Sequence, residues 1–182
     1  MLTIGDQFPT FRLTGVVGGP KGLDPKTAFT TVTDADDPAL WKVVFFWPKD
    51  FTVLCPTEIT SFGRLTDDFQ ARNAALYGVS VESELAHMNW RIHHADLRDL
   101  PFVMLSDIRR ELSQACGILD RNEGVPMRAT FILDPDGIIR FVSVNDFSVG
   151  RNPQEVLRVL DALQSGEICP SEWRKGDPVL SA

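Results

Sequence analysis

Hydrophobic residues along this chain fall into two patterns: short continuous runs, typical of buried strands, and spacings of three or four residues, typical of amphipathic helices. The continuous runs predict strands at 42–47, 75–81 and 102–105. The helical spacing predicts helices at 59–69, 84–94 and 107–116. Strands and helices therefore alternate, which favours an α/β fold with a central sheet.

A β-hairpin is predicted around the turn residues Asp136 and Gly137. Apolar runs at 129–133 and 138–144 flank the turn, and Asp-Gly supplies the positive-φ positions that a tight turn requires. Hairpin strands pair antiparallel, so we expect a mixed central sheet flanked by helices. The Gly- and Pro-bearing stretch at 15–25 is expected to be a surface loop.

The last helix is expected to begin at Pro153, with Asn152 as its N-cap and Glu155 as the acid of a capping box. After this helix the pattern of core positions ends. We therefore expect one domain over residues 1–165, followed by a C-terminal arm over residues 166–182.

Composition and net charge argue against two kinds of binding partner, nucleic acids and membranes. The 182 residues are 43% hydrophobic, which suits one compact domain, and the formal net charge is -7. Such a charge offers no basic surface to nucleic acid or to an anionic membrane, so we expect neither partner. No apolar stretch approaches the roughly 18 residues of a membrane span, and residues 1–10 lack a secretory signal pattern. A cytoplasmic protein is expected.

The chemistry of this chain is expected at its cysteines. They are Cys55, Cys116 and Cys169, and the histidines are His87, His93 and His94. Three widely spaced cysteines without a Cys-x-x-Cys pair do not predict a disulfide framework, and their spacings from the histidines are not those of a zinc site. We expect no metal and no other cofactor. Cys116, on the apolar side of a predicted helix end, is expected to be a buried core thiol.

Cys55 follows a predicted strand at the point where a helix should begin, and the hydroxyl of Thr52 lies three residues upstream. A thiol attacks the O–O bond of a peroxide only as the thiolate. The first turn of a helix favours that charged form, because unpaired backbone N–H groups and the positive end of the helix dipole face it. Cys55 is therefore the candidate nucleophile, although a lone cysteine is more often buried and inert.

The segment Pro48-Lys49-Asp50-Phe51-Thr52-Val53-Leu54-Cys55 matches the Pro-x-x-x-Thr-x-x-Cys signature of the peroxiredoxins. Arg128-Ala129-Thr130-Phe131-Ile132 and Gly166-Glu167-Ile168-Cys169-Pro170 resemble the two-cysteine subgroup of that family. The chain is most similar to the bacterial alkyl hydroperoxide reductases of the actinobacterial kind, and the resemblance extends from Leu2 to Pro178. It implies a thioredoxin-like fold and a thiol-dependent peroxidase with an antioxidant role.

The resemblance also implies roles for individual residues. It places Arg128 beside Cys55, where a guanidinium would stabilise the thiolate and the charge on the departing oxygen. Thr52 would hydrogen-bond between the sulfur and the peroxide, Pro48 would shield the pocket from water, and Glu58 would hold the arginine. Taken one at a time, these residues also fit plain structural roles as a cap, a strand end, a first-turn acid and a surface charge.

Cys169 is the resolving cysteine that the resemblance implies. The family pattern sends it to Cys55 of a second subunit, where it would trap the sulfenic acid as an intersubunit disulfide. A homodimer follows, and such dimers commonly join into rings. Trp90 resembles an aromatic residue that lines the family's peroxide pocket, although core packing explains it equally well, and Arg151 would support Arg128. No acid–base role is assigned to the histidines.

Two other functions share this fold. A thiol-disulfide oxidoreductase would need a Cys-x-x-Cys turn, but Thr52 stands where its first cysteine would be. A holdase chaperone would need no thiol, so its activity should survive Cys55→Ser. The sequence leaves open the preferred peroxide and the protein that reduces the disulfide, for which a thioredoxin, a flavoprotein reductase and a small Cys-x-x-Cys reductase are the candidates.

Overall fold

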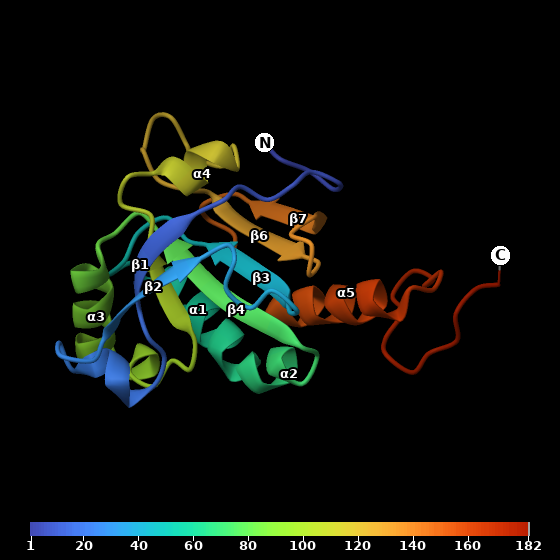
Figure 1. Ribbon diagram of the computed structural model, residues 1–182, viewed down its shortest axis with the longest axis horizontal. Coiled ribbons are helices and arrows are strands. Elements are labelled where there is room, and N and C mark those ends of the chain that lie inside the picture. The colour runs from blue at the N-terminus through green and yellow to red at the C-terminus, as the bar shows by residue number, and fades with distance from the viewer. Residues whose placement is uncertain (182) are drawn as a thin grey trace.

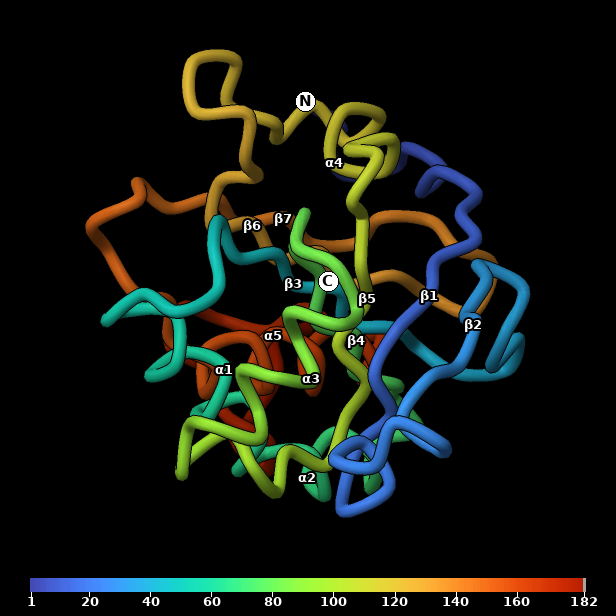
Figure 2. The backbone as a smooth tube through the Cα atoms, turned by 90° about the vertical axis from the view of Figure 1, so that its left-hand side faces the viewer, coloured from blue at the N-terminus to red at the C-terminus, as the bar shows by residue number. Residues whose placement is uncertain are grey.

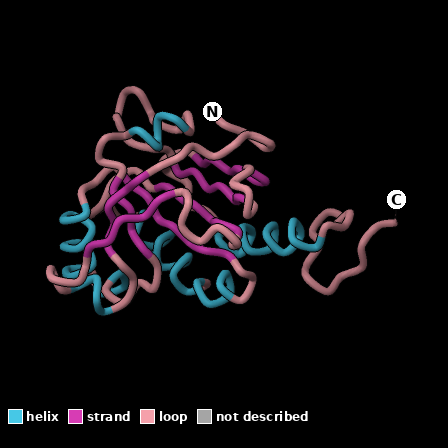
Figure 3. The backbone as a smooth tube through the Cα atoms, viewed as in Figure 1, coloured by secondary structure: helices cyan, strands magenta, loops and turns pink. Residues whose placement is uncertain are grey.

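The computed structural model describes residues 1–181, which form a seven-stranded sheet with helices on both faces (Figures 1 and 3). The strands are β1 (Arg12–Val16), β2 (Phe29–Thr33), β3 (Trp41–Phe46), β4 (Ala74–Ser80), β5 (Val103–Ser106), β6 (Arg128–Leu133) and β7 (Ile139–Asn145). The helices are α1 (Cys55–Arg64), α2 (Thr66–Gln70), α3 (Glu84–His93), α4 (Glu111–Ala115) and α5 (Pro153–Ser165), with short 3-10 helices η1 (Pro20–Leu23) and η2 (Ala95–Leu97). The expected α/β class is confirmed.

The strand order is β2-β1-β5-β4-β3-β6-β7, so the sheet is mixed as expected (Figure 2). The central strands β3, β4 and β5 pair parallel, and the outer strands join them antiparallel. The predicted hairpin is β6 and β7, and Gly137 takes the positive φ of 78° in its turn. Within the described residues, every helix is too short or too polar to cross a lipid bilayer.

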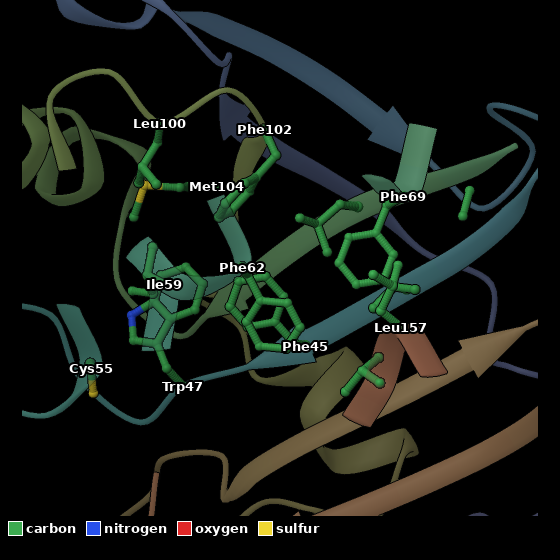
Figure 4. Packing of buried hydrophobic residues seen from close by; sticks show 14 of the residues in the cluster. Phe45, Trp47, Cys55, Ile59, Phe62, Phe69, Leu100, Phe102, Met104 and Leu157 are labelled. Carbon is green, nitrogen blue, oxygen red and sulfur yellow. The ribbon is translucent and has the colours of Figure 1, made fainter. Parts of the chain in front are cut away.

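Both faces of the sheet are buried, and the side chains of β3 alternate between the two hydrophobic clusters that cover these faces. Val43 and Phe45 pack in the cluster that includes α1, α2 and α5, whereas Val44 and Phe46 pack in the cluster that includes α4. In Figure 1, α4 lies above the sheet and α1, α2 and α5 lie below it. Phe45 stacks on Phe62 of α1 with ring centroids 4.1 Å apart (Figure 4). This packing fixes the start of α1 near the end of β3.

The helix expected at 59–69 has other bounds in the structure. It begins earlier, at Cys55, which agrees with the expected position of the cysteine at a helix start. Leu65, with φ -101° and ψ 7°, interrupts it, so α1 and α2 are separate helices. The apolar spacing continued across this break because both helices face the same cluster.

The helix expected at 107–116 is shortened to α4. Arg110 has a left-handed backbone with φ 61°, which breaks the helical path before Glu111. The buried carboxylate of Asp107 accepts hydrogen bonds from the backbone N of Leu112 and Ser113 at 3.1 and 2.8 Å. A side chain thus replaces a first helical turn as the partner of these N–H groups.

The expectation of a surface loop at 15–25 is met only in part, at residues 17–19 and 24–25, which lie outside helices and strands. Gly15 and Val16 belong to β1, and η1 contains the buried Gly22. Three of the five residues of β2 are threonines, and neither β1 nor β2 has the continuous apolar run that marked the central strands. Antiparallel pairing of β1 with β5, a contact distant in sequence, places them in the sheet.

The helix α5 is capped as expected by Asn152, whose side chain accepts a hydrogen bond from the N of Gln154 at 3.1 Å. The capping-box role of Glu155 is wrong, because its two carboxylate oxygens bind Arg158 at 2.7 and 2.8 Å. Beyond α5 the chain lies away from the sheet (Figure 1), and Trp173 is its buried anchor.

Candidate active site

Cys55 is the first residue of α1 and is fully buried, at the edge of the cluster that contains Phe45 (Figure 4). No side chain caps the helix, because the N-cap position is taken by Leu54, and Pro56 occupies the second helical position. The sulfur therefore lies at the positive end of the helix without a competing carboxylate or hydroxyl cap. Reactive cysteines are commonly found at this position of a helix.

Arg128, the first residue of β6, brings a permanent positive charge to Cys55. Its Nη1 donates to the Cys55 Sγ at 3.3 Å, and its Nε donates to the carbonyl of Phe147 at 2.8 Å. The side chain is 4% exposed. The predicted proximity of Arg128 to Cys55 is therefore found in the structure, with the guanidinium held by a second contact.

Glu58, one turn after Cys55 on α1, binds both arginines of the site. It accepts from Arg128 Nη1 at 2.5 Å and from Arg151 Nε at 2.8 Å. Burial by itself would raise the pKa of this carboxyl, but the charge and hydrogen bonds of Arg151, with the charge of Arg128, outweigh burial and lower the pKa. Glu58 is thus a buried carboxylate that orients Arg128.

Arg151 supports the site from the loop before α5. Its Nη1 donates to the carbonyl of Ala129 at 2.7 Å, and its guanidinium lies over the rings of Phe45 and Phe62, 5.4 and 5.7 Å from their centroids. Burial lowers the pKa of Arg151, and the carboxylate of Glu58 partly restores it. The sequence prediction that Arg151 assists Arg128 has a clear physical route, through the shared Glu58.

A cavity of about 280 Å³ opens beside residues 47–54, the cysteine loop that joins β3 to α1. Its lining residues are Pro48, Lys49, Thr52, Glu123, Val125 and Phe147. The Lys49 Nζ and a carboxylate oxygen of Glu123 form an ion pair of 2.9 Å. Thr52 and Pro48 thus line one cavity, but Cys55 is not among its lining residues. The Thr52 hydroxyl donates to the carbonyl of Lys49 at 3.3 Å, and its predicted bond to sulfur is not among the contacts.

The cysteine loop is anchored by a buried pair that sequence reasoning missed. Asp50 Oδ2 lies 2.7 Å from His87 Nδ1, and Asp50 Oδ1 accepts from the indole Nε1 of Trp47 at 2.7 Å. The other ring nitrogen of His87 lies 3.2 Å from the carbonyl of Leu105. The available signals were an acid in the signature segment and a histidine in the predicted helix, but nothing in the sequence paired them.

Trp90 of α3 is buried in the same cluster as Cys55 and packs on Phe51 of the cysteine loop, with ring centroids 5.7 Å apart. The core-packing interpretation of Trp90 is therefore confirmed, whereas the residues that line the cavity beside Thr52 do not include it. The effect of Trp90 on the site is to position the cysteine loop.

The three cysteines are free thiols in different surroundings. Cys116 is buried as expected, and burial, with the charge of Asp107, raises its pKa to about 12. Cys169 is partly exposed and belongs to the arm beyond α5, and this arm lies away from the sheet (Figure 1). Among the described residues, no three His, Cys, Asp or Glu side chains are grouped as ligands of a metal ion.

A buried thiol at a helix N-terminus, in contact with a guanidinium and beside a cavity, is the arrangement of a thiol-dependent peroxidase, and this is the class that the fold and the site define. The chain belongs to the AhpC/TSA family, whose family model matches residues 4–142. The peroxiredoxin resemblance read from the sequence is therefore confirmed, and the enzyme reduces peroxides by thiol chemistry in an antioxidant role.

Individual relatives support this family assignment. Alkyl hydroperoxide reductase C of Mycobacterium tuberculosis is 57% identical over 100% of this chain and 95% of its own length. The structure of Mycobacterium bovis AhpC, also 57% identical, covers 96% of this chain and 99% of its own with a TM-score of 0.88. A reduced 2-Cys peroxiredoxin of Plasmodium vivax, 29% identical, covers 98% of this chain and 93% of its own with a TM-score of 0.89. The fold is thus the thioredoxin-like fold of the peroxiredoxins.

Proposed function

We propose that Cys55 reduces hydrogen peroxide and organic hydroperoxides. The observation that carries this proposal is the 3.3 Å contact between Arg128 Nη1 and the Cys55 sulfur at the start of α1. The thiolate attacks the O–O bond, one oxygen bonds to sulfur, and the other leaves with the bonding electron pair and takes up a proton. The products are a sulfenic acid on Cys55 and water or an alcohol.

The residues around Cys55 have distinct roles in this proposal. Arg128 stabilises the thiolate before attack and the negative charge on the leaving oxygen during attack. Glu58 and Arg151 keep Arg128 in place, so that no reorganisation is needed when charge develops. Thr52 aligns the peroxide. Its hydroxyl, which donates to the carbonyl of Lys49, turns to the bound substrate, while Pro48 limits the access of water.

The sulfenic acid is resolved by Cys169 of a second copy of the chain. Its thiolate attacks the Cys55 sulfur, hydroxide leaves and takes up a proton as water, and an intersubunit disulfide joins the two chains. Cys169 belongs to the arm that extends beyond the far end of α5 (Figure 1), and this extension supports a reach to another subunit. Residues 1–165 then act as the peroxidase domain and residues 166–182 as the resolving arm.

A homodimer is the smallest assembly that this chemistry needs, and rings of dimers are its extension. Phe51 and Val53, on the cysteine loop, are 62% and 94% exposed, and Leu85 of α3 is 54% exposed. Exposed apolar side chains on two adjoining elements suit a contact between dimers. The disulfide is reduced by a dithiol or flavin-dependent reductase in the cytoplasm; thioredoxin, a flavoprotein reductase and a small Cys-x-x-Cys reductase are the candidates.

Rapid mixing of the pre-reduced protein with hydrogen peroxide tests this function. Tryptophan fluorescence should show a fast phase that Cys55→Ser abolishes and Cys169→Ser retains, because Trp90 and Trp47 are close to the cysteine loop. Non-reducing gels should show a disulfide dimer that either substitution removes. Cys116→Ser is the matched control, and it should keep both signals. A Cys55→Ser protein that reacts like the wild type would disprove the proposal.

A further inference from the structure

Ser165 is the last residue of α5, and its hydroxyl makes three contacts at the point where the arm begins. The Oγ lies 2.7 Å from the carbonyl of Ala162, 3.2 Å from the backbone N of Glu167 and 3.5 Å from the sulfur of Cys169. Gly166, with φ 68° and ψ 5°, turns the chain back so that Cys169 can reach this hydroxyl.

The direction of the hydrogen bonds follows from counting protons. A hydroxyl carries one proton and two lone pairs, and a carbonyl oxygen can only accept. The short contact with Ala162 therefore takes the proton of Ser165. The N–H of Glu167 donates to one lone pair, and the other lone pair faces the sulfur, so Cys169 must be the donor. In this arrangement Cys169 is held as a neutral thiol.

The C-terminal end of α5 also favours the neutral thiol of Cys169. The last carbonyl groups of a helix carry the negative end of its dipole, which disfavours an anion. Cys55 has the opposite setting, at a helix start beside Arg128. The two cysteines of the cycle thus lie at helix ends of opposite polarity, and the geometry favours a thiolate at Cys55 and a thiol at Cys169.

One cation opposes this effect. This cation is Arg158 of α5. The pKa of Arg158 is raised, mainly by the hydrogen bond of its guanidinium to Glu155 and to a lesser degree by the nearby Cys169. Its guanidinium is already bound to both oxygens of Glu155, at 2.7 and 2.8 Å, and to the carbonyl of Trp173 at 3.0 Å. The carboxylate of Glu155 therefore largely balances the positive charge of Arg158, which weakens the effect of that charge on Cys169.

We propose that Ser165 is a positioning residue that keeps Cys169 protonated and docked at the end of α5 until the arm moves to a second subunit. This rests on the proposed resolving role of Cys169. The attacking form of Cys169 is the thiolate, so the Ser165 bond must break before the disulfide forms and water leaves. Ser165 then sets part of the rate of resolution, and through it the time for which the Cys55 sulfenic acid is open to further oxidation.

The test measures Cys169 alone, without peroxide. In a Cys55→Ser, Cys116→Ser background, the alkylation rate of Cys169 by iodoacetamide is followed against pH. Ser165→Ala removes the acceptor of the thiol proton, so the midpoint of the profile should move to lower pH and alkylation near neutral pH should rise about two- to fivefold, as expected for one modest hydrogen bond. Ser165→Thr keeps the hydroxyl and should restore the profile.

Ser171→Ala, which removes an exposed serine two positions after Cys169, is the matched control and should leave the profile unchanged. A merely structural loosening of the arm would raise the rate equally at every pH and leave the midpoint fixed, and that result would overturn the proposal. The failure of the resolving role would be seen separately, as a disulfide dimer that persists in Cys169→Ser, whatever the alkylation profile shows.

Discussion

Glu58 and Arg151 are joined at two points, although they lie 93 residues apart in the chain: Arg151 donates to Glu58 Oε1 from its backbone N at 2.9 Å and from its Nε at 2.8 Å. The other carboxylate oxygen accepts from Arg128, which also donates to the sulfur of Cys55. One buried carboxylate thus balances two guanidinium groups. The position of the catalytic arginine therefore depends on a residue that does not touch the sulfur.

Glu58→Gln should damage both stability and activity. Removing one charge of a buried ion pair typically costs about 3–5 kcal/mol, and here two guanidinium groups lose their carboxylate, so the free energy of unfolding should fall by about that amount. Oxidation of Cys55 should slow because Arg128 loses the group that fixes it. Urea unfolding and rapid-mixing fluorescence measure the two effects.

The matched control is Glu123→Gln, since Glu123 pairs with Lys49 on the surface, where the two side chains are 55% and 47% exposed. This substitution should leave the unfolding free energy almost unchanged, because exposed ion pairs contribute little. Equal losses of stability in the two variants would show that the buried ion pairs of Glu58 contribute no more to stability than an exposed ion pair.

The same carboxyl should set part of the acid sensitivity of the fold. The pKa of Glu58 is lowered below its ordinary 4.5, because Arg151 and Arg128 outweigh burial. A carboxyl with a lowered folded-state pKa stabilises the protein above its ordinary pKa, and this contribution is lost as the pH falls through the folded value. The Tm of the wild type should therefore fall more steeply below about pH 4.5 than the Tm of Glu58→Gln. Parallel curves by circular dichroism would contradict the assignment.

Arg128→Lys tests the geometry of the cation rather than its charge. Lysine keeps the positive charge but cannot donate at once to Cys55, Glu58 and the carbonyl of Phe147, as the guanidinium does. Loss of one aligned donor typically lowers a rate by about 10²–10³, and we expect a decrease of this order in the rate constant for Cys55 oxidation. Arg140→Lys, on β7, exchanges an exposed arginine and should keep the wild-type rate. A near-wild-type rate for Arg128→Lys would mean that charge alone suffices.

Much of the fold could be predicted because its centre has simple periodicity. From Val43 to Phe46 the strand β3 is a continuous apolar run, since both of its faces are buried, and α5 carries a recognisable cap in Asn152. The strands β1 and β2 were missed because neither is a continuous apolar run, and only their pairing with other strands places them in the sheet. The expected long helix at 107–116 failed because Asp107 satisfies the backbone N–H groups that a first turn would otherwise leave free.

The functional site, like the fold, could be predicted only in part from the sequence. Cys55 and Thr52 lie in one contiguous motif, and the family resemblance added Arg128, Glu58 and Arg151. The pairing of Asp50 with His87 could not be predicted, because it joins a loop to α3 through the core and neither residue has a local pattern that specifies the other. Long-range polar pairs of this kind are visible only once the packing is known.

Asp50→Ala should loosen the cysteine loop. The substitution leaves the buried indole N–H of Trp47 and the ring of His87 without their carboxylate partner, and each lost buried bond costs about 1–3 kcal/mol. Backbone amides of residues 47–54 should then exchange with deuterium faster than in the wild type. Asp136→Ala, in the exposed β6–β7 turn, should not change their exchange. Unchanged protection of the loop in Asp50→Ala would show that Trp90 and the core alone hold it.

The cavity beside Thr52 should distinguish bulky from small peroxides. Its volume of about 280 Å³ is much larger than the roughly 30 Å³ that a water molecule occupies, so hydrogen peroxide leaves most of it unfilled, whereas an aryl or alkyl group can pack on Val125 and Phe147. Phe147→Ala removes apolar wall but keeps the backbone carbonyl that binds Arg128. A change of this size in an apolar pocket typically alters selectivity by about 10-fold or more. We therefore expect kcat/KM for cumene hydroperoxide to fall about 10-fold, and that for hydrogen peroxide by less than about twofold.

Ser148→Ala, at the neighbouring exposed position, is the control for this experiment and should leave the ratio of the two kcat/KM values unchanged. The ratio is the informative quantity because a general disturbance of the Arg128 contact would slow both peroxides together. An equal loss for the two substrates would therefore assign Phe147 to the support of Arg128, and it would remove the cavity from the recognition of organic hydroperoxides. A loss confined to cumene hydroperoxide would establish that the wall formed by Val125 and Phe147 binds the organic group.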